Sequence, residues 1–328
     1  MIHLIIPDIQ GGVQDFASIL QVEMGPDMVD LVPLSVSNVT SWKIQPGDSV
    51  FLQMSGYGFS KRGTALWLLR EMEKRRHEIK SFGVFFHELY AFGPPWKSAF
   101  WVSPIQRHVV RRLTELSDFW MTNREGSAQW LRRYAGHKPH AVLPVFSTVG
   151  EPQSLSAARK RRLVVFGSAG LRTVTYRAAG SELFQWAKRQ SIEIHDIGST
   201  VMDVQVKDTI KANGVTQHGR LEAHDISDLM RGSLFGLVAY PVNYVAKSSV
   251  FATYCAHGLC PVLLSKGFAP SDGLVAGQHY LPGVPTVIVD ADKVQWIGEH
   301  AWKWYQPHGV WQHVSALYEL LHASHEII

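Results

Sequence analysis

The sequence predicts an α/β protein with two doubly wound domains, because short apolar segments alternate with amphipathic helical segments in both halves of the chain. The alternation stops near residue 147 and resumes near residue 162. The chain has 328 residues, which is enough for two domains that each bury a core. We therefore expect two mainly parallel sheets, each with helices on both faces.

The first domain is expected at residues 1–146. Its expected strands are 2–6, 30–34, 49–54, 82–86, 119–122 and 141–144. Its expected helices are about 14–22, 63–77, 101–116 and 125–134. This repetition of strand and helix is typical of a parallel sheet covered by helices.

The second domain is expected at residues 162–305, after a linker at 147–161 that carries Ser, Gly and Pro and has a basic end. Its expected strands are 163–166, 192–194, 214–217, 234–239, 261–264 and 286–289. Its expected helices are near 176–189, 222–231, 248–256 and 291–305. The two expected domains are therefore of similar size.

The composition is that of an ordinary globular enzyme, with 46% hydrophobic and 18% charged residues. The apolar segments are too short to span a bilayer, and the first residues lack the basic region of a secretion signal. The two cysteines, Cys255 and Cys260, fit a compartment that keeps thiols reduced. We therefore expect a cytoplasmic protein, with the inner face of the membrane as an alternative location.

Positive charge is concentrated in residues 61–80 and 106–138, which each carry seven Lys or Arg against three Asp or Glu. A solvated helix face is the plainer interpretation of each segment. Peripheral membrane contact through these basic helices of the first domain is the alternative. Neither segment has an RNA- or DNA-binding signature, so we expect no nucleic-acid partner.

Four loops that follow expected strands are rich in Gly, His, Arg and Lys. They are PDIQGGVQD, FFHELYAFGPPW, FGSAGLRTVTYR and AYPVNYVAKSSVFATYCAHGLCPVLL. Ligands of open α/β sheets bind at the carboxyl ends of the strands. The loops therefore predict a site for a phosphorylated ligand.

Several common site chemistries are excluded by the same residues. No G-x-G-x-x-G or G-x-x-x-x-G-K-[ST] motif occurs in these loops, which excludes the usual dinucleotide fingerprint and the P-loop. His87 and Glu88 begin an H-E-x-x-H pattern, but position 91 is Ala91. Asp290 and Asp292 form D-x-D at an expected helix start, where capping is the favoured role. We expect no metal site.

Five segments together resemble the GT-B fold glycosyltransferases, in particular the bacterial group 1 (family 4-like) type that uses sugar nucleotides. They are GGVQDFA, FFHEL, HGRLEAHDISDLMRGSLFGLVAYP, ATYCAHGLCPVLLS and GLVAGQHYLP, in that order. The resemblance implies two Rossmann-like domains facing a cleft, with the acceptor on the first and the donor on the second. It also implies that a helix in residues 306–328 packs back on the first domain.

The resemblance assigns roles in the first domain to four residues. Gly11 and Gly12 would lie against the donor diphosphate or the acceptor, and a bare structural turn is the alternative. His87 would line the cleft near the transferred sugar with Glu88 beside it, and a buried core histidine is the alternative.

In the second domain the resemblance places Gly167 and Arg172 under the donor diphosphate, where an arginine neutralises leaving-group charge. Arg177 is a rival for that task. A fixed cation or a helix N-terminus replaces a metal in this arrangement, so no metal and no cofactor beyond the donor substrate is implied.

The sequence departs from the family at the E-x7-E glutamates of its retaining members, whose places hold Val245 and Thr253. Lys247, Ser248 and Ser249 stand at a predicted helix start instead, and we interpret them as contacts to the donor phosphates. The alternative is that Ser248 is a simple helix cap and Lys247 is solvated.

These observations predict a glycosyltransferase that moves a sugar from a nucleotide-sugar donor to a carbohydrate or lipid-linked acceptor. Asp8, Asp15, His87 and Glu88 are the candidate bases for an inverting reaction. Retention is favoured, because Asp8 and Asp15 flank the glycine loop without an obvious base position. The alternatives are a non-catalytic module that binds a sugar nucleotide or a partner protein, and a sugar-nucleotide epimerase.

Overall fold

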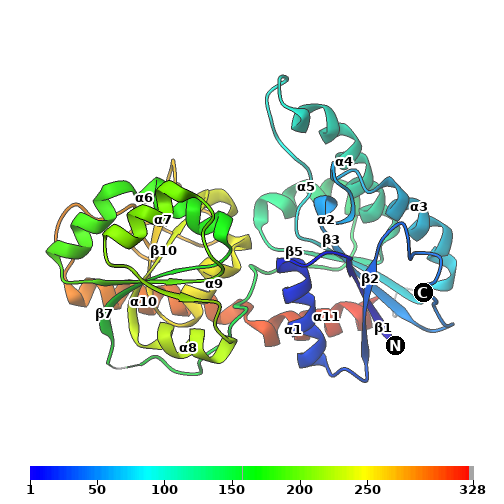
Figure 1. Ribbon diagram of the computed structural model, residues 1–328. Helices are drawn as coiled ribbons and strands as arrows, with labels where there is room; N and C mark the ends of the chain where they lie inside the picture. The colour runs from blue at the N-terminus through cyan, green and yellow to red at the C-terminus, as the bar shows by residue number, and fades with distance from the viewer. Residues whose placement is uncertain (157, 325–328) are drawn as a thin grey trace. The chain divides into compact units, whose positions relative to one another are not determined.

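The computed structural model describes residues 1–156 and 158–324, which form two compact units (Figure 1). The first unit contains Met1–Pro144 and the chain from Val310 onward. The second unit contains Val145–Gly309. Most of the expected linker 147–161 thus belongs to the second unit, and residue 157 lies outside the described residues.

The first unit is built on a parallel sheet with the strand order β2-β1-β3-β4-β5-β6. The strands are β1 (Ile2–Pro7), β2 (Val29–Leu34), β3 (Ser49–Met54), β4 (Ser81–Phe86), β5 (Phe119–Thr122) and β6 (His140–Val142). Each overlaps one expected strand. Because the chain runs from β1 to one side and then returns to the other, the sheet has its topological switch point between β1 and β3.

Seven helical segments surround this sheet in the described residues. They are α1 (Gly12–Met24), α2 (Gly56–Phe59), α3 (Leu66–Arg75), the 3₁₀ turn η1 (Arg76–Glu78), α4 (Ser98–Leu116), α5 (Glu125–Ala135) and α11 (Val310–Ala323). The last of these packs on α1, where the rings of His313 and Phe16 lie 5.4 Å apart. The end of the expected segment 306–328, residues 325–328, lies outside the described residues.

The core of the first unit follows from burial of the sheet on both faces. Every residue of β3 and β4 is buried, as their continuous apolar runs require. Gly83 in β4 is needed for packing, because a Cβ there would lie 2.1 Å from the ring of Phe119. The interior is therefore closely packed and leaves the strand ends as the place for a ligand.

The second unit has a parallel sheet with the strand order β12-β11-β10-β7-β8-β9, which is the classical dinucleotide-binding order. The strands are β7 (Lys160–Phe166), β8 (Glu193–Ile197), β9 (Thr216–Gly219), β10 (Ser233–Ala239), β11 (Cys260–Leu264) and β12 (Leu281–Pro282). The expected strand at 286–289 is wrong, because β12 ends at Pro282. Val287 and Ile288 are 71% and 77% exposed, which a buried parallel strand does not allow.

The helical segments of the second unit include one that was not expected from the sequence, α7. The set is α6 (Ala169–Arg189), α7 (Val204–Ala212), α8 (Ala223–Arg231), the 3₁₀ segment η2 (Val242–Lys247), α9 (Ser249–Ala256), α10 (Ala291–Tyr305) and the 3₁₀ turn η3 (Gln306–His308). Helix α6 is interrupted at Gly180, whose φ of 56° and ψ of −154° break the helix. Glycine adopts this backbone conformation without the strain that a side chain would bring.

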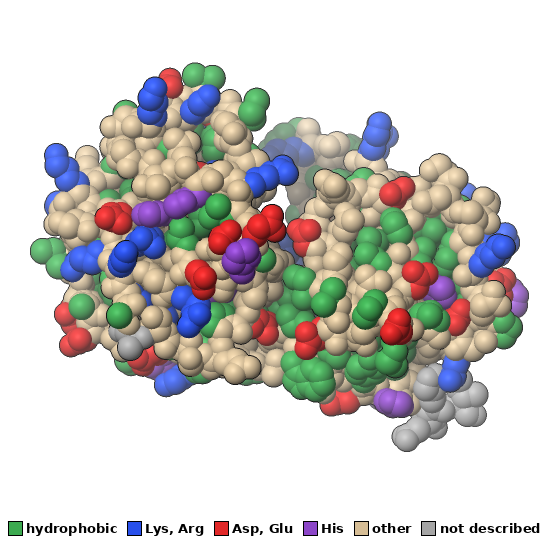
Figure 2. Space-filling model, turned by 60° about the horizontal axis from the view of Figure 1, so that its bottom comes forward, with side chains coloured by type: hydrophobic (Ala, Val, Ile, Leu, Met, Phe, Trp, Pro, Cys, Tyr) green, Lys and Arg blue, Asp and Glu red, His purple; other side chains and the backbone are tan. Residues whose placement is uncertain are grey.

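Charge is interspersed over the surface. Figure 2 shows Lys and Arg side chains next to Asp and Glu side chains on one face of each unit. In the basic segment 61–80, Arg75 pairs with Glu71 and Arg76 pairs with Asp118. The side chains of both pairs are largely buried, so these two arginines brace the first unit instead of forming a solvated face. In the described part of the chain, no helix is long and apolar enough to cross a membrane.

Candidate functional site

The glycine pair of the first unit lies where β1 leads into α1. Gly12 is the first residue of α1, and Gly11 caps the helix with an extended backbone at φ 161°. A Cβ built at either glycine would meet no described atom within 4 Å. Neither a left-handed backbone nor close packing therefore explains Gly11. The exposed pair leaves the backbone of this helix end open at the switch point of the sheet.

His87 directly follows β4 and is half-buried at the same edge of the sheet. Its Nε2 forms a hydrogen bond of 2.9 Å with Oε1 of Gln53. Its ring packs on Phe16 and Phe85, with centroids 5.1 and 4.5 Å away. The structure thus holds the imidazole in one orientation, and Glu88 beside it is also half-buried.

Two amide side chains beside His87 are buried with one end unsatisfied. Gln53 is 0% exposed and Asn123 is 1% exposed. Among the described residues, Nε2 of Gln53 and Oδ1 of Asn123 have no hydrogen-bond partner, although Nδ2 of Asn123 donates to the carbonyl of His87. A buried polar atom without a partner costs about 1–3 kcal/mol. Since neither atom reaches the surface, these two amides form a buried polar layer behind His87, where an ordered water would satisfy them.

Sequence reasoning missed both amides. The sequence does mark their positions. Gln53 is a polar residue between apolar neighbours at the end of β3, and Asn123 immediately follows β5. Asp8 and Asp15 lie on either side of the glycine pair, and both residues are exposed. Burial of part of the Asp15 carboxyl group, in the first turn of α1, raises its pKa.

In the second unit, Gly167 occupies the turn from β7 into α6 with a φ of 121°, a conformation that favours glycine. Ser168 caps α6 by accepting a hydrogen bond from the Leu171 N–H at 3.3 Å. A Cβ at Gly198 would lie 2.3 Å from the Gly167 carbonyl oxygen, so two loops approach closely here. The backbone conformation and close packing therefore explain why a glycine stands at position 167, whereas neither explains Gly11.

The structure gives the Arg172 side chain partners within the second unit, and its expected role under a donor diphosphate stays a prediction. The side chain is 1% exposed, and its guanidinium pairs with the Asp196 carboxylate and donates to the backbone carbonyls of Gly167 (2.9 Å) and Ser199. Burial raises the pKa of Asp196, and Arg172 opposes that shift. These contacts hold the ends of β7 and β8 and their loops together.

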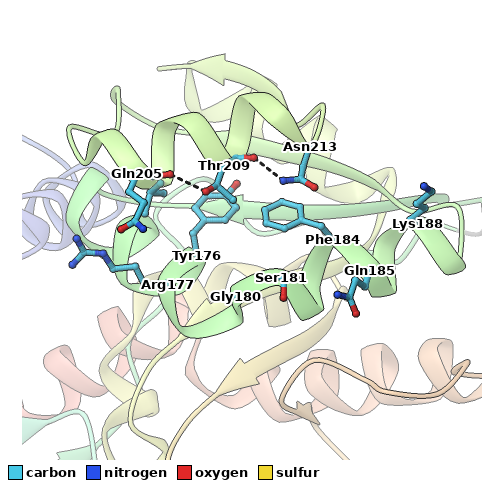
Figure 3. A pocket seen from close by; sticks show the side chains of 11 residues that line it. Tyr176, Arg177, Gly180, Ser181, Phe184, Gln185, Lys188, Gln205, Thr209 and Asn213 are labelled. Atoms are coloured by element: carbon cyan, nitrogen blue, oxygen red, sulfur yellow. Dashed lines mark hydrogen bonds between the residues drawn. The ribbon is translucent and has the colours of Figure 1, made fainter.

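The rival Arg177 lies on the side of the second unit. It is eight residues into α6, about 12 Å from the start of that helix. Its guanidinium pairs with Asp203, and it lines a cavity of about 610 Å³ between α6 and α7. Figure 3 shows the rings of Tyr176 and Phe184 pointing toward α7 in this cavity. Arg177 therefore does not contact the β7 turn.

The three residues Lys247, Ser248 and Ser249 have different environments in the structure. Ser248 is buried, and its Oγ accepts a hydrogen bond from the Phe251 N–H at 3.2 Å. It is thus the cap of α9, as the alternative interpretation has it, and the expected phosphate contact stays a prediction. Ser249 begins α9 and is half-buried, and the Lys247 ammonium lies 5.8 Å from the ring centroid of Tyr244.

A cavity of about 750 Å³ lies at the carboxyl ends of β10, β11 and β12. Its walls combine apolar side chains with the polar Glu182, Asn243, Ser265 and Lys266. The volume lies in the range of small-molecule and cofactor sites. Sequence reasoning singled out the AYPVN loop but missed Lys266, which follows β11 at the same edge.

Comparison with solved structures decides the fold, whereas a scan of protein-family models and a search of curated protein sequences found no match. The pneumococcal O-GlcNAc transferase GtfA, solved in complex with UDP and GlcNAc, is similar with a TM-score of 0.56 at 12% identity; the match covers 88% of this chain and 59% of GtfA. TarM from S. aureus, solved with UDP, fondaparinux and alpha-GlcNAc-glycerol, has a TM-score of 0.58 at 9% identity, with 87% and 57% covered. The chain has the GT-B fold.

The GT-B fold confirms the expected fold class. A putative UDP-N-acetylglucosamine 2-epimerase from Listeria monocytogenes is also similar, with a TM-score of 0.58 at 10% identity; the match covers 98% of this chain and 97% of that protein. The chain therefore spans less than two thirds of GtfA and of TarM, and nearly the whole length of the Listeria protein. Transferases and an epimerase thus share this GT-B architecture.

Proposed function

We propose that the protein is a glycosyltransferase that moves a sugar from a nucleotide-sugar donor to a carbohydrate or lipid-linked acceptor. The observation that carries the proposal is the cavity of about 750 Å³ at the carboxyl ends of β10, β11 and β12 of a GT-B chain. Its apolar wall suits a nucleoside, and the ammonium of Lys266 suits a phosphate. GtfA and TarM were solved with UDP, which supports a nucleoside diphosphate as the shared ligand.

In this proposal the second unit binds the donor. Lys266, together with the half-buried Lys247 and Ser249 at the start of α9, would supply the positive potential that stabilises the leaving diphosphate. Arg172 contributes indirectly, because it holds the β7 turn in place through the Gly167 carbonyl. No metal or cofactor is included in the proposed mechanism.

The first unit is proposed to bind the acceptor and the transferred sugar. The imidazole of His87 would contact the reacting groups, with its orientation set by the hydrogen bond to Gln53. The buried amides of Gln53 and Asn123 would position His87, because they contact its ring and its backbone carbonyl. The open backbone at Gly11 and Gly12 would admit a ligand at the start of α1.

Retention of configuration is the proposed outcome. A retaining transfer depends on donor positioning and on stabilising the leaving group. An inverting transfer needs a base, and Asp15 with its raised pKa is the first carboxylate to test in that role. Turnover that survives Asp15→Asn would support retention, and abolished turnover would favour inversion.

The deciding experiment is a donor screen on the full chain. UDP-, GDP- and dTDP-sugars are tested for a thermal shift, and those that bind are incubated with carbohydrate and lipid-linked acceptors and followed by mass spectrometry. Transfer or slow donor hydrolysis supports the proposal. Binding without turnover would indicate a non-catalytic module, interconversion of the donor sugar would indicate an epimerase, and absence of any binding would overturn the proposal.

A further inference from the structure

The segment between β4 and the middle of α4 exposes large apolar side chains in the first unit. Trp96 is 83% exposed, Trp101 is 69% exposed and Phe92 is 63% exposed. Phe100 and Ile105 add two more exposed apolar side chains in the first two turns of α4. In Figure 1 the loop before α4 and the start of that helix project beyond the rest of the first unit. We call residues 90–105 the aromatic tip.

Hydrogen bonds tie the aromatic tip to the body of its unit. The Trp101 indole N–H donates to the Pro95 carbonyl at 2.8 Å, which closes the loop on the helix. Gln106 is buried; its Oε1 accepts from the Ala91 N–H at 2.7 Å and its Nε2 donates to the Arg62 carbonyl at 2.8 Å. The exposed rings are therefore displayed by an ordered backbone.

Charge changes along α4 from an apolar end to a basic end. The first two turns expose Phe100, Trp101 and Ile105, whereas the later turns expose Arg107 and Arg111. Of the four cations in residues 89–114, Arg111 and Arg112 pair with Glu115, which leaves Lys97 in the aromatic tip and Arg107 next to it. At 1.5 Å per residue, Arg107 lies about 9 Å and Arg111 about 15 Å along the helix from Trp101.

We propose that the aromatic tip inserts into the interfacial region of a bilayer that contains anionic lipids. Tryptophan rings favour the headgroup level, and apolar groups of interfacial segments enter about 5–10 Å below it. With the tip inserted to that depth, Arg107 lies at the level of the lipid phosphates, and Lys97 reaches them by extending its stem. The basic segment 106–138 thus acts together with an apolar anchor that precedes it in the chain.

The shape of the tip favours a bilayer over a protein partner. A stable protein interface buries about 800 Å² on each partner over a broad surface, whereas the exposed rings here lie on one projecting loop and the first turns of one helix. A convex tip instead suits a fluid interface that closes around it. The proposal concerns the outer surface of the first unit and stands whether or not the protein transfers a sugar.

The test is vesicle flotation of the full chain with phosphatidylcholine alone and with phosphatidylcholine mixed with phosphatidylglycerol. We expect binding to the mixed vesicles and little to the neutral ones. Trp96→Ser combined with Trp101→Ser should weaken binding at least about tenfold. Lys97→Gln combined with Arg107→Gln should weaken it by roughly fivefold per cation and remove its salt dependence.

Trp311→Ser is the matched control, because Trp311 is 61% exposed and lies on α11 of the same unit. The Trp96→Ser single variant guards against misfolding of the double variant, and the melting temperature of each variant is compared with that of the wild type. Equal binding to both vesicle types, equal loss in the Trp311→Ser control, or no vesicle binding would overturn the proposal. Tip-dependent dimers by light scattering without vesicle binding would assign the surface to a second copy instead.

Discussion

The two units share the same arrangement of a parallel sheet between helices, but they differ in how far the buried polar side chains near their strand ends are hydrogen-bonded. In the first unit, Gln53 and Asn123 are buried with unsatisfied amide atoms beside His87. In the second unit, Arg172 is buried with its guanidinium paired to Asp196 and two carbonyls. Burial separates these side chains from the surface in both units. The difference is that the second unit pairs its buried guanidinium, whereas the first unit leaves one amide atom of each residue without a partner among the described residues.

The largest effect is expected from Arg172→Met, which leaves the Asp196 carboxylate buried without its partner. Loss of one member of a buried ion pair costs about 3–5 kcal/mol. Denaturant unfolding measures the loss, with Arg177→Met as the control because Arg177 is exposed and its pair with Asp203 is worth little. Retained stability with lost nucleotide binding would return Arg172 to the donor site.

His87→Ala tests whether the histidine of the first unit serves turnover or stability. We expect turnover to fall about a hundredfold, as for a residue that contacts the reacting groups, while the melting temperature changes little because the ring is half-buried. Kinetics and thermal unfolding of the same preparation measure both, and the exposed His77→Ala is the control. Full turnover with a large loss of stability would make His87 a core histidine.

Lys266→Ala tests the cavity of the second unit. Loss of one charge-assisted contact should weaken nucleoside diphosphate binding by about tenfold or more, measured by calorimetry. Lys293→Ala is the control, since Lys293 is exposed on α10 and does not line the cavity. If Lys247→Ala weakens binding and Lys266→Ala does not, the donor phosphates lie at the start of α9 instead.

Two of the buried histidines, His313 in the first unit and His257 in the second, predict that the protein loses stability at acidic pH. Burial lowers the pKa of His313 in the first unit and of His257 in the second to about 4, against 6.5 for an ordinary histidine. The unfolded chain therefore binds protons that the folded chain does not, and stability falls as the pH falls from 6.5 toward 4. His313→Gln or His257→Gln should each reduce the proton uptake on unfolding by about one. An unchanged uptake would contradict these shifts.

The smallest effect on stability is expected from Gly11, and Gly167 in the other glycine loop serves as its contrast. Gly11→Ala meets open space in an extended backbone, so stability should change by less than about 0.5 kcal/mol while the KM rises if a ligand approaches there. Gly167→Ala should cost about 1–3 kcal/mol because its φ of 121° strains any side chain. Thermal unfolding and kinetics of both variants separate the loops. Unchanged kinetics in Gly11→Ala would leave the glycine pair as a turn.

Much of the fold could be predicted because it depends on local pattern. Strands β3 and β4 are buried on both faces, so they appear in the sequence as continuous apolar runs. Helix α5 is buried on one face, so its apolar residues recur at helical spacing. The run at 286–289 looked the same as these strands, and its exposure depends on the chain leaving the sheet after β12. Helix α7 was missed in a segment with only two buried residues, Val206 and Ile210.

The sequence by itself determined the two parallel α/β units and the loops that carry glycine, histidine and basic residues, because hydrophobic periodicity and turn residues act locally. Only the tertiary structure decided which of those residues the fold itself uses. Arg172 and Ser248 form hydrogen bonds within the second unit, while Gly11 and Gly12 are exposed and leave the start of α1 open. The physical reason is that hydrogen-bond partners such as Asp196 and the Gly167 carbonyl come from segments brought together by folding, which local pattern does not encode.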